Sequence, residues 1–272
     1  MSICRDAPLP VSQIPDFWER VRNARHRLLA LDYDGTLAPF NIDRMKAFPF
    51  SGIVEMLSKI QDSRNTSLVI ISGRMVDEVL KLMGNIGATI IGNHGSEIRN
   101  PDGAVRLIPP DSAQRKRLEQ AWMEVSNLAV MQSIMDRLER KPTSIAVHTR
   151  GMDTEKAGYI LKEVSRIWSE GAEEHSMMCQ EFNGGVELRC SGINKGMAIR
   201  NFLQEKMPED AFCTYIGDDR TDEDAFKEIQ INKRGIGIRV GPQKDATAAL
   251  GYLSDVETVY DFLKEWARVT IG

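Results

Sequence analysis

Residues 28–36 read Leu-Leu-Ala-Leu-Asp-Tyr-Asp-Gly-Thr, an apolar run that ends abruptly in two carboxylates. A short, continuous apolar run bounded by a polar turn is typical of a strand that is buried on both faces, as in parallel sheets. Side chains alternate along an extended chain, so Asp32 and Asp34 are expected on the same side. The stretch therefore predicts a buried strand with two acids at its carboxyl end.

Similar apolar runs recur along the chain and also end at glycine or polar residues. They cover residues 67–71, 88–91, 213–216 and 236–240. Helix-like spacing of apolar residues lies between or after them, at 51–60, 75–83 and 195–206. Strands that alternate with helices of this length form βαβ units. We therefore predict an α/β fold with a doubly wound, Rossmann-like core built on a parallel sheet.

The region from 108 to 190 departs from this pattern. Its expected elements are a helical stretch over 114–138, a strand over 143–148, a helix over 154–168 and strands over 177–182 and 186–190. The last two strands flank Asn183-Gly184-Gly185, a signal for a β-hairpin. Helices with antiparallel strands indicate an inserted α+β module. We predict a catalytic core in residues 1–107 and 191–272, and an α+β cap domain in residues 108–190.

Composition excludes several classes of protein. The chain has 272 residues, with 35 Lys+Arg against 39 Asp+Glu and a formal net charge of −4, which offers no basic surface for nucleic acid or an anionic membrane. No apolar run is long enough to span a bilayer, and the first residues do not resemble a secretory signal. The 4 cysteines are scattered, which favours reduced thiols over disulfides or zinc. We expect a cytoplasmic protein with neither nucleic-acid nor membrane partners.

Polar residues follow four of the expected strands. In an open parallel sheet, ligands bind outside the carboxyl ends of the strands. If these strands lie side by side, one crevice collects the following residues: Asp32, Asp34, Ser72, Arg74, Asn93, His94, Asp218, Asp219 and Asp222. This convergence is the main sequence evidence for a site.

The Asp32/Asp34 pair fits covalent phosphoryl chemistry. One carboxylate can serve as a nucleophile, and the second can supply the proton that a leaving alkoxide needs. A calcium loop or an Asx turn would also use Asp-x-Asp-Gly. An EF-hand is disfavoured, because a strand precedes Asp32 and Asp43 occupies the twelfth position, where a glutamate is required.

The segment 218–224 holds five acidic residues, at 218, 219, 222, 223 and 224. Carboxylates crowded at a strand end repel one another unless a cation is present, and Mg²⁺ prefers such oxygen ligands. The alternative is a helix start, where acids favour the positive end of the helix dipole. Because the cluster begins right at a strand end, we favour the metal interpretation, with Asp218 facing the ion.

Ser72-Gly73-Arg74 and Lys195 are candidates for holding a phosphate. The first group lies at a strand-to-helix turn, where backbone N–H groups and a positive helix end suit an anion. Lys195 starts another helix and could place its charge on a transferring phosphoryl group. Taken alone, Ser72-Gly73-Arg74 could also be an ordinary turn, and Lys195 could be an ordinary solvated lysine.

In this order, the four motifs resemble those of the haloacid dehalogenase superfamily of aspartyl-dependent phosphohydrolases. The run Gly217-Asp218-Asp219-Arg220-Thr221-Asp222-Glu223-Asp224-Ala225-Phe226 is similar to the trehalose-6-phosphate phosphatase branch in particular. The resemblance implies that Asp32 is the nucleophile and Asp34 the general acid and base. It further implies that Mg²⁺ is held by Asp32, the Asp34 backbone carbonyl and Asp218, with support from Asp219 and Asp222. Ser72, Gly73, Arg74 and Lys195 would bind the phosphate, with Lys195 also counted as catalytic.

The inserted module also resembles that family's cap. The resemblance covers residues 138–141, 148–150 and 185–189, and it departs at Thr149, where the family often has an aromatic residue. It implies that four residues contact the sugar: Glu139, Lys141, Arg150 and Glu187.

The resemblance implies a Mg²⁺-dependent phosphatase that hydrolyses trehalose 6-phosphate and belongs to trehalose biosynthesis. We would then expect a phosphosugar substrate, a monomer, and a pathway link to a trehalose-6-phosphate synthase. Two alternatives stay open: a related phosphatase for another phosphosugar, such as sucrose phosphate or mannosylglycerate phosphate, and a sugar-phosphate sensor without turnover. A phosphomutase would share the Asp pair. A dinucleotide-dependent dehydrogenase is disfavoured, because no G-x-G-x-x-G follows the first strand.

Overall fold

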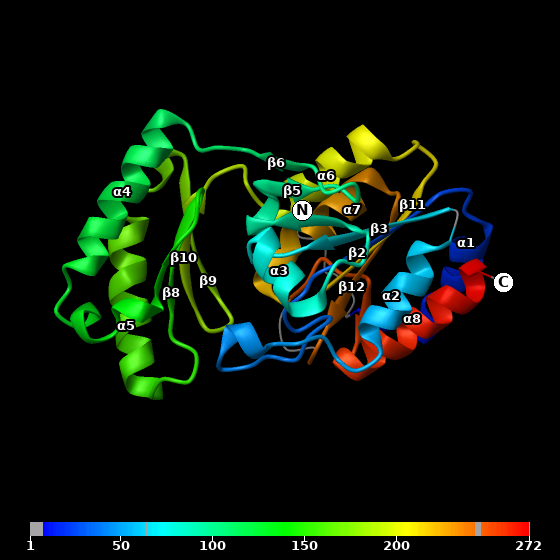
Figure 1. The fold of residues 1–272 in the computed structure, drawn as a ribbon, viewed down its shortest axis with the longest axis horizontal. Coiled ribbons are helices and arrows are strands. Elements are labelled where there is room, and N and C mark those ends of the chain that lie inside the picture. The colour runs from blue at the N-terminus through cyan, green and yellow to red at the C-terminus, as the bar shows by residue number, and fades with distance from the viewer. Residues whose placement is uncertain (1–7, 64, 243–245, 272) are drawn as a thin grey trace. The chain divides into compact units, whose positions relative to one another are not determined.

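The computed structural model describes residues 8–63, 65–242 and 246–271. The chain divides into two compact units, one formed by Met1–Arg106 with Asn194–Gly272 and the other by Leu107–Ile193. The first unit is therefore assembled from two separate segments of the chain, and the second is inserted between them (Figure 1). We call them the core unit and the inserted unit.

One large sheet forms the centre of the core unit. Its strand order is β1-β13-β12-β11-β2-β3-β4-β5-β6. The strands are β1 (Leu9–Pro10), β2 (Arg27–Leu31), β3 (Thr66–Ile71), β4 (Thr89–Gly92), β5 (Glu97–Arg99), β6 (Val105–Leu107), β11 (Phe212–Gly217), β12 (Gly235–Val240) and β13 (Gly251–Leu253). Neighbours from β1 to β4 in this order pair in parallel, and β5 pairs antiparallel to β4. The predicted α/β fold with a mostly parallel sheet is confirmed.

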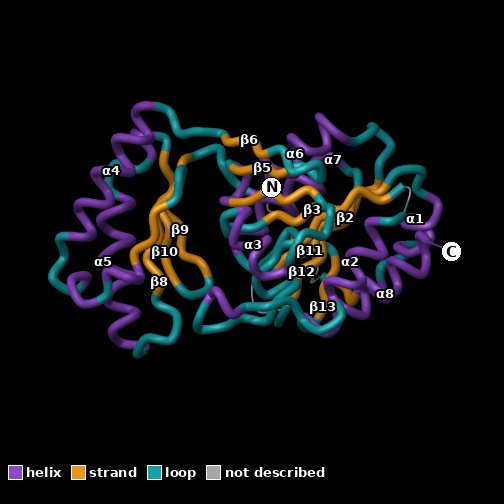
Figure 2. The backbone as a smooth tube through the Cα atoms, viewed as in Figure 1, coloured by secondary structure: helices purple, strands orange, loops and turns teal. Residues whose placement is uncertain are grey.

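Helices cover both faces of this sheet (Figure 2). They are α1 (Phe17–Asn23), α2 (Ile53–Gln61), α3 (Val76–Met83), α6 (Lys195–Lys206), α7 (Glu223–Asn232) and α8 (Val256–Ile271). Along β2, Leu29 and Leu31 join a core with α1, α2, α3 and α8, whereas Leu28 and Ala30 join a second core with α6 and α7. A strand that must be apolar on both faces explains the unbroken apolar run that ends at Asp32.

The inserted unit is a four-stranded antiparallel sheet with helices packed on one face. Its strand order is β7-β8-β10-β9. The elements are β7 (Leu138–Arg140), β8 (Ser144–His148), β9 (Met177–Phe182), β10 (Gly185–Cys190), α4 (Ser112–Ser126) and α5 (Thr154–Ser169). Trp168 of α5 is fully buried, and its indole N–H donates to the carbonyl of Ala121 in α4 at 3.2 Å. The predicted hairpin is confirmed, because Phe182 pairs with Gly185 across Asn183 and Gly184.

The expectation of one helical stretch over 114–138 is wrong. Helix α4 ends at Ser126, two short 3-10 turns follow at Met131–Ser133 and Met135–Arg137, and Leu138 begins β7. Met131 and Ile134 still enter the core of the inserted unit from these turns. The apolar spacing over 114–138 therefore arises from several short segments that each pack into the core, and not from one continuous helix.

Candidate active site

The end of β2 places Asp32 at the centre of the parallel sheet. Its backbone N–H donates to the carbonyl of Ile216 in the neighbouring β11 at 2.8 Å, so two strand ends meet here. The residue is only 4% exposed. The chain then turns sharply, with Gly35 at φ +76°, a value that most side chains disfavour. A carboxylate is thus held rigidly at the carboxyl edge of the sheet, as the sequence predicted.

Lys195 joins two of the acids. It is the first residue of α6, whose N-terminus is capped by the Asn194 side chain. Its Nζ lies 2.7 Å from Asp32 Oδ1 and 2.7 Å from Asp222 Oδ1, and the side chain is almost fully buried. The two carboxylates raise the pKa of the ammonium far above its usual range and outweigh the opposing effect of burial. The site therefore favours the charged form of Lys195.

Asp222 uses both of its oxygens inside the protein. Oδ1 accepts from Lys195 and from the hydroxyl of Tyr215, and Oδ2 accepts the backbone N–H groups of Asp218 and Asp219 at 3.0 and 2.9 Å. The approach is so close that a Cβ on Gly217 would lie 2.3 Å from Asp222 Cγ. Asp222 therefore shapes the loop after β11 and fixes Lys195.

Asp218 differs from Asp222, because its Oδ1 is buried and makes no hydrogen bond to any described residue. A Cβ on Gly35 would lie 2.2 Å from Asp218 Oδ2, so the turn after β2 keeps room for this carboxylate. Burial raises the pKa of Asp218 well above its usual range, and the charges of Asp32 and Asp222 add to this. For Asp32, burial raises the pKa to about 7 against the attraction of Lys195.

These acids form a candidate cation site. Oxygens of Asp32, Asp218 and Asp222 all lie within 4.8 Å of one another. A hard divalent cation would offset the repulsion between these buried carboxylates and accept the unpartnered oxygen of Asp218. Since Asp222 is fully occupied by hydrogen bonds, the free oxygens of Asp32 and Asp218 suit a metal better. The residues present therefore fit an oxygen-liganded ion.

Arg74 and Asp34 form a two-point ion pair. Arg74 Nε lies 2.6 Å from Asp34 Oδ2, and Nη2 lies 2.7 Å from Asp34 Oδ1. The guanidinium also lies over the ring of Tyr33, 5.4 Å from the ring centroid. The sequence predicted that both residues lie at the site, with Arg74 on the phosphate, but it did not anticipate this direct pairing.

Ser72 follows β3, the neighbour of β2, and is buried. Its Oγ accepts the backbone N–H of Arg74 at 3.2 Å. A Cβ on Gly73 would lie 2.7 Å from the ring of His94, so the turn needs glycine to pass the imidazole. Asn93 in turn donates its backbone N–H to the carbonyl of Arg74 at 2.7 Å. The ends of β3 and β4 are thereby locked together.

The core unit holds one group of the predicted site residues, and the inserted unit holds the other. The first comprises Asp32, Asp34, Ser72, Gly73, Arg74, Lys195, Asp218, Asp219 and Asp222. Asp219 caps the short 3-10 turn Arg220–Asp222, where its Oδ1 accepts the N–H of Arg220 at 2.6 Å. It thus contributes to the shape of the acidic loop.

In the inserted unit, three of the four predicted sugar contacts meet on one sheet. Lys141 Nζ lies 3.4 Å from Glu139 Oε2 and 3.8 Å from Glu187 Oε1. Register explains the meeting, because Glu139 and Glu187 both lie opposite Ala146. Arg150 contacts the hairpin, donating to the carbonyl of Asn183 at 2.7 Å.

Two further residues of these clusters are not marked by the sequence pattern. His148 Nε2 lies 2.8 Å from Glu139 Oε2, yet its role could not be assigned from the sequence. Tyr215 lies inside an apolar run, where nothing marks its hydroxyl as a partner of Asp222. Alternation along β8 and β11 was the only available signal, and it shows which face a residue takes but not what it contacts.

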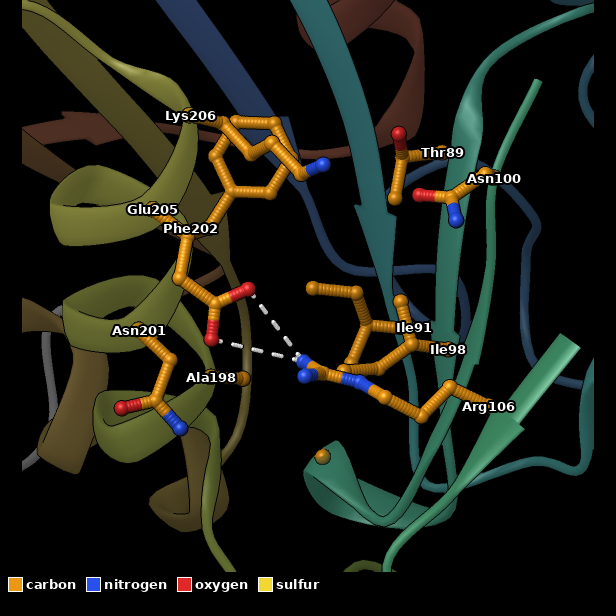
Figure 3. Close-up of a pocket in the computed structure, with 11 residues that line it drawn as sticks. Thr89, Ile91, Ile98, Asn100, Arg106, Ala198, Asn201, Phe202, Glu205 and Lys206 are labelled. Atoms are coloured by element: carbon orange, nitrogen blue, oxygen red, sulfur yellow. Dashed lines mark hydrogen bonds and ion pairs between the residues drawn. The ribbon is translucent and has the colours of Figure 1, made fainter. Parts of the chain in front are cut away.

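A separate cavity of about 170 Å³ lies in the core unit between α6 and the strands β4, β5 and β6 (Figure 3). Phe202 and Lys206 line one side, and Thr89 and Asn100 the other. Arg106 and Glu205 bridge it at 3.4 Å. None of the predicted catalytic residues lines this cavity.

Comparison with known proteins identifies the family. The model of a protein family described as "Trehalose-phosphatase" matches residues 30–255, which make up most of the chain. The chain belongs to the trehalose-phosphatase family. The resemblance to the trehalose-6-phosphate phosphatase branch that was noted in the sequence is therefore confirmed.

Relatives of this trehalose-phosphatase family member differ in length. The trehalose 6-phosphate phosphatase RA3 of Zea mays is 30% identical over 262 residues, which cover 89% of this chain and 70% of that protein. A trehalose-phosphatase of Schizosaccharomyces pombe is 28% identical over 262 residues, which cover 91% of this chain but only 31% of that protein. A protein of Dictyostelium discoideum, "Alpha,alpha-trehalose-phosphate synthase [UDP-forming] B", is 28% identical over a match that covers 95% of this chain and 32% of that protein. The chain thus spans about a third of the length of the latter two.

Solved structures support the fold of the family. The C-terminal domain of a Candida albicans trehalose-6-phosphate phosphatase superimposes with a TM-score of 0.82 at 21% identity, covering 97% of this chain and 99% of that one. BT1666 of Bacteroides thetaiotaomicron, a phosphatase of the haloalkanoate (HAD) superfamily, gives a TM-score of 0.60 at 17% identity, covering 89% of this chain and 95% of that one. Among the described residues, no helix has the length and apolar character to cross a membrane.

Proposed function

We propose that the chain is a Mg²⁺-dependent phosphatase that converts trehalose 6-phosphate to trehalose and inorganic phosphate. The observation that carries the proposal is Asp32, a buried carboxylate held by Lys195 beside an unpartnered oxygen of Asp218. Family membership over residues 30–255 supports the substrate class. A binding protein without turnover would not need a second carboxylate at Asp34 beside the first.

In the first half of the reaction, an oxygen of Asp32 attacks the phosphorus of the ester. Lys195 Nζ lies 2.7 Å from Oδ1, so its positive charge stays beside the attacking carboxylate. The bond between phosphorus and the sugar oxygen breaks, and the sugar oxygen takes a proton from Asp34, which enters this half of the cycle in its protonated form. The products are the free sugar and an aspartyl-phosphate on Asp32.

The second half returns the enzyme to its starting state. A water molecule loses a proton to the carboxylate of Asp34 as its oxygen attacks the phosphorus. The bond between phosphorus and Asp32 then breaks, which releases inorganic phosphate and regenerates the Asp32 carboxylate. Lys195 and the hydroxyl and N–H groups around Ser72 and Gly73 would hold the phosphoryl oxygens throughout.

For the metal, the proposed ligands are the side chains of Asp32 and Asp218 and the backbone carbonyl of Asp34. A bound Mg²⁺ would supply positive charge to the phosphoryl oxygens as charge develops on them. Asp222 supports the site from behind, since its oxygens hold Lys195 and the loop of Asp218. Asp219 supports it by capping that loop.

For the sugar, the proposed contacts are Glu139, Lys141, Arg150 and Glu187 of the inserted unit. Carboxylates accept hydrogen bonds from sugar hydroxyls, and ammonium and guanidinium groups donate to them. In the structure, Ser144 donates its hydroxyl to Glu187 Oε1 at 2.8 Å, which orients that carboxylate. The substrate itself would come from a synthase, a link supported by a bifunctional synthase/phosphatase of Thermoproteus tenax that is 28% identical over 219 residues, 80% of this chain and 29% of that protein.

A panel of phosphosugars tests the substrate. Purified chain with Mg²⁺ is incubated with trehalose 6-phosphate, sucrose phosphate, mannosylglycerate phosphate and glucose 6-phosphate, and released phosphate is measured. We expect kcat/KM for trehalose 6-phosphate to exceed the others by at least about tenfold, which corresponds to about 1.4 kcal/mol of discrimination. Equal rates contradict the assigned substrate. Sugar phosphate returned in place of free phosphate indicates a mutase, and binding without release indicates a sensor.

Removal of the unpartnered carboxylate tests the metal site. Mg²⁺ at a hundred times its Kd should stabilise the wild-type chain by about 2.7 kcal/mol, seen as a rise in Tm over EDTA-treated protein. Asp218→Asn should lose most of this rise, because it removes a charged ligand. Asp210→Asn, an exposed acid before β11, is the matched control and should behave as wild type. A full Mg²⁺ response in Asp218→Asn would contradict the assignment.

A further inference from the structure

We propose that Arg74 is a positioning residue that sets the orientation of Asp34 toward the leaving sugar oxygen. The inference rests on the proposed function, which assigns Asp34 as the proton donor. It goes beyond the sequence expectation, in which Arg74 binds only the phosphate. The distinction matters because a positioning residue affects proton transfer, whereas a phosphate ligand affects every phosphate ester alike.

The geometry of the pair supports orientation rather than mere attraction. Two nitrogens of one planar group meet two oxygens of the other, at 2.6 and 2.7 Å. Two parallel hydrogen bonds of this kind fix the rotation of a carboxylate, which a single contact cannot do. The Arg74 side chain is 4% exposed and that of Asp34 is 26% exposed. The partner is therefore buried, while the acid stays within reach of a substrate.

Arg74 is itself held from several directions. Its backbone N–H donates to Ser72 Oγ, and its carbonyl accepts from Asn93 at 2.7 Å. The guanidinium lies over the ring of Tyr33, whose hydroxyl donates to the carbonyl of Ala47 at 2.8 Å. A buried guanidinium that lies over a ring loses little further freedom when it holds a carboxylate. The orientation of Asp34 is thus set by a rigid part of the core unit.

The remaining edge of the guanidinium also fits this role. Arg74 Nη1 is buried and makes no hydrogen bond to any described residue. Two nitrogens are committed to Asp34, so at most this third nitrogen is left for a phosphoryl oxygen of the substrate. If Nη1 contacts a phosphoryl oxygen, the same planar guanidinium holds both Asp34 and the phosphate ester. The observed contacts of the guanidinium with a side chain of the site are thus both made to Asp34.

Leaving-group dependence tests the proposal. Release of the leaving group is followed in single turnovers with Mg²⁺, which report the first half of the reaction and not hydrolysis of the aspartyl-phosphate. The two substrates are p-nitrophenyl phosphate, whose leaving group departs without a proton, and the best sugar phosphate of the panel, whose alkoxide needs one. In Arg74→Met, the single-turnover rate of sugar release should fall about a hundredfold, within the range that general acid catalysis contributes. The fall for p-nitrophenyl phosphate should be less than about tenfold. Arg74→Lys should lie between, because an ammonium cannot form the two parallel bonds.

Two further comparisons make the outcome decisive. In an Asp34→Asn background, Arg74→Met should cause no further loss with the sugar phosphate, since both changes remove the same step. Arg25→Met, which changes an exposed arginine of the core unit outside the site, is the matched control and should match wild type. Equal losses on both esters, or an unchanged sugar-phosphate rate, would overturn the positioning role. Failure of the wild-type chain to hydrolyse any sugar phosphate would instead overturn the proposed function.

Discussion

Replacing Asp32 by Asn is expected to lower kcat for phosphate release by at least about a thousandfold, because the amide cannot attack phosphorus as a carboxylate does. The structure makes this change unusually clean. Asn has nearly the same shape, and Lys195 keeps its 2.7 Å contact with Asp222. The folded state should therefore persist, and the substrate should still bind. Phosphate release under saturating sugar phosphate and Mg²⁺ is the measurement.

Asp210→Asn serves as the control here too, because it removes an exposed acid of the same kind from the core unit. Binding of the sugar phosphate to the Asp32→Asn protein should be measured by calorimetry beside the rate. A variant that binds and does not turn over matches the nucleophile role. Full activity in Asp32→Asn would remove Asp32 from that role and, with it, the covalent mechanism.

Replacing Lys195 by Met should lower stability as well as activity. The change leaves Asp32 and Asp222 buried without their shared cation, and breaking a buried ion pair by removing one partner costs about 3 to 5 kcal/mol. For a protein of this size, that corresponds to a fall in Tm of roughly 10 °C. The measurement is thermal unfolding in EDTA, so that no added cation compensates the loss.

A second substitution tests the cause of this loss. Lys195→Met combined with Asp222→Asn should recover part of the lost stability, because it removes one of the stranded charges. Lys227→Met, an exposed lysine in α7, is the matched control and should change Tm little. If the Lys195→Met variant has the same Tm as the wild-type protein, the ion pairs at the site do not stabilise the core unit.

The core of the fold could be predicted because its strongest signals are local. A strand buried on both faces needs an unbroken apolar run, and residues 28–31, 67–71 and 213–216 each supply one. The observed β2, β3 and β11 extend these runs by a residue at one or both ends. Parallel strands share one carboxyl edge, so the sequence alone is enough to predict that Asp32 and Asp218 lie close together.

Helix α8 was missed although the sequence carries a signal for it, whereas strand β13 was missed because it carries none. Helix α8 buries Val259, Phe262, Leu263 and Trp266, which follow the spacing of one helix face. Strand β13 is only three residues long and begins at glycine, so no apolar run marks it. Its place in the sheet comes from parallel pairing with β12, a contact between distant residues.

The working details of the site could not be read from residue types. Asp218 and Asp222 look alike in the sequence, yet only Asp222 has both oxygens committed to hydrogen bonds. The pairing of Arg74 with Asp34 joins residues forty positions apart. Such pairings depend on rotamers and on burial, which alternation and spacing do not specify.

The position of β2 also determines the order in which the core unit can be completed during synthesis. One neighbour, β3, begins at Thr66, whereas the other, β11, begins at Phe212, after the whole inserted unit. A ribosome therefore delivers Asp32 long before β11 and Asp218, the residue that follows it. Until β11 emerges, β2 has an unpaired edge that is open to other strands. We expect the inserted unit to fold first, and the core unit to fold only after its last strands have been synthesised.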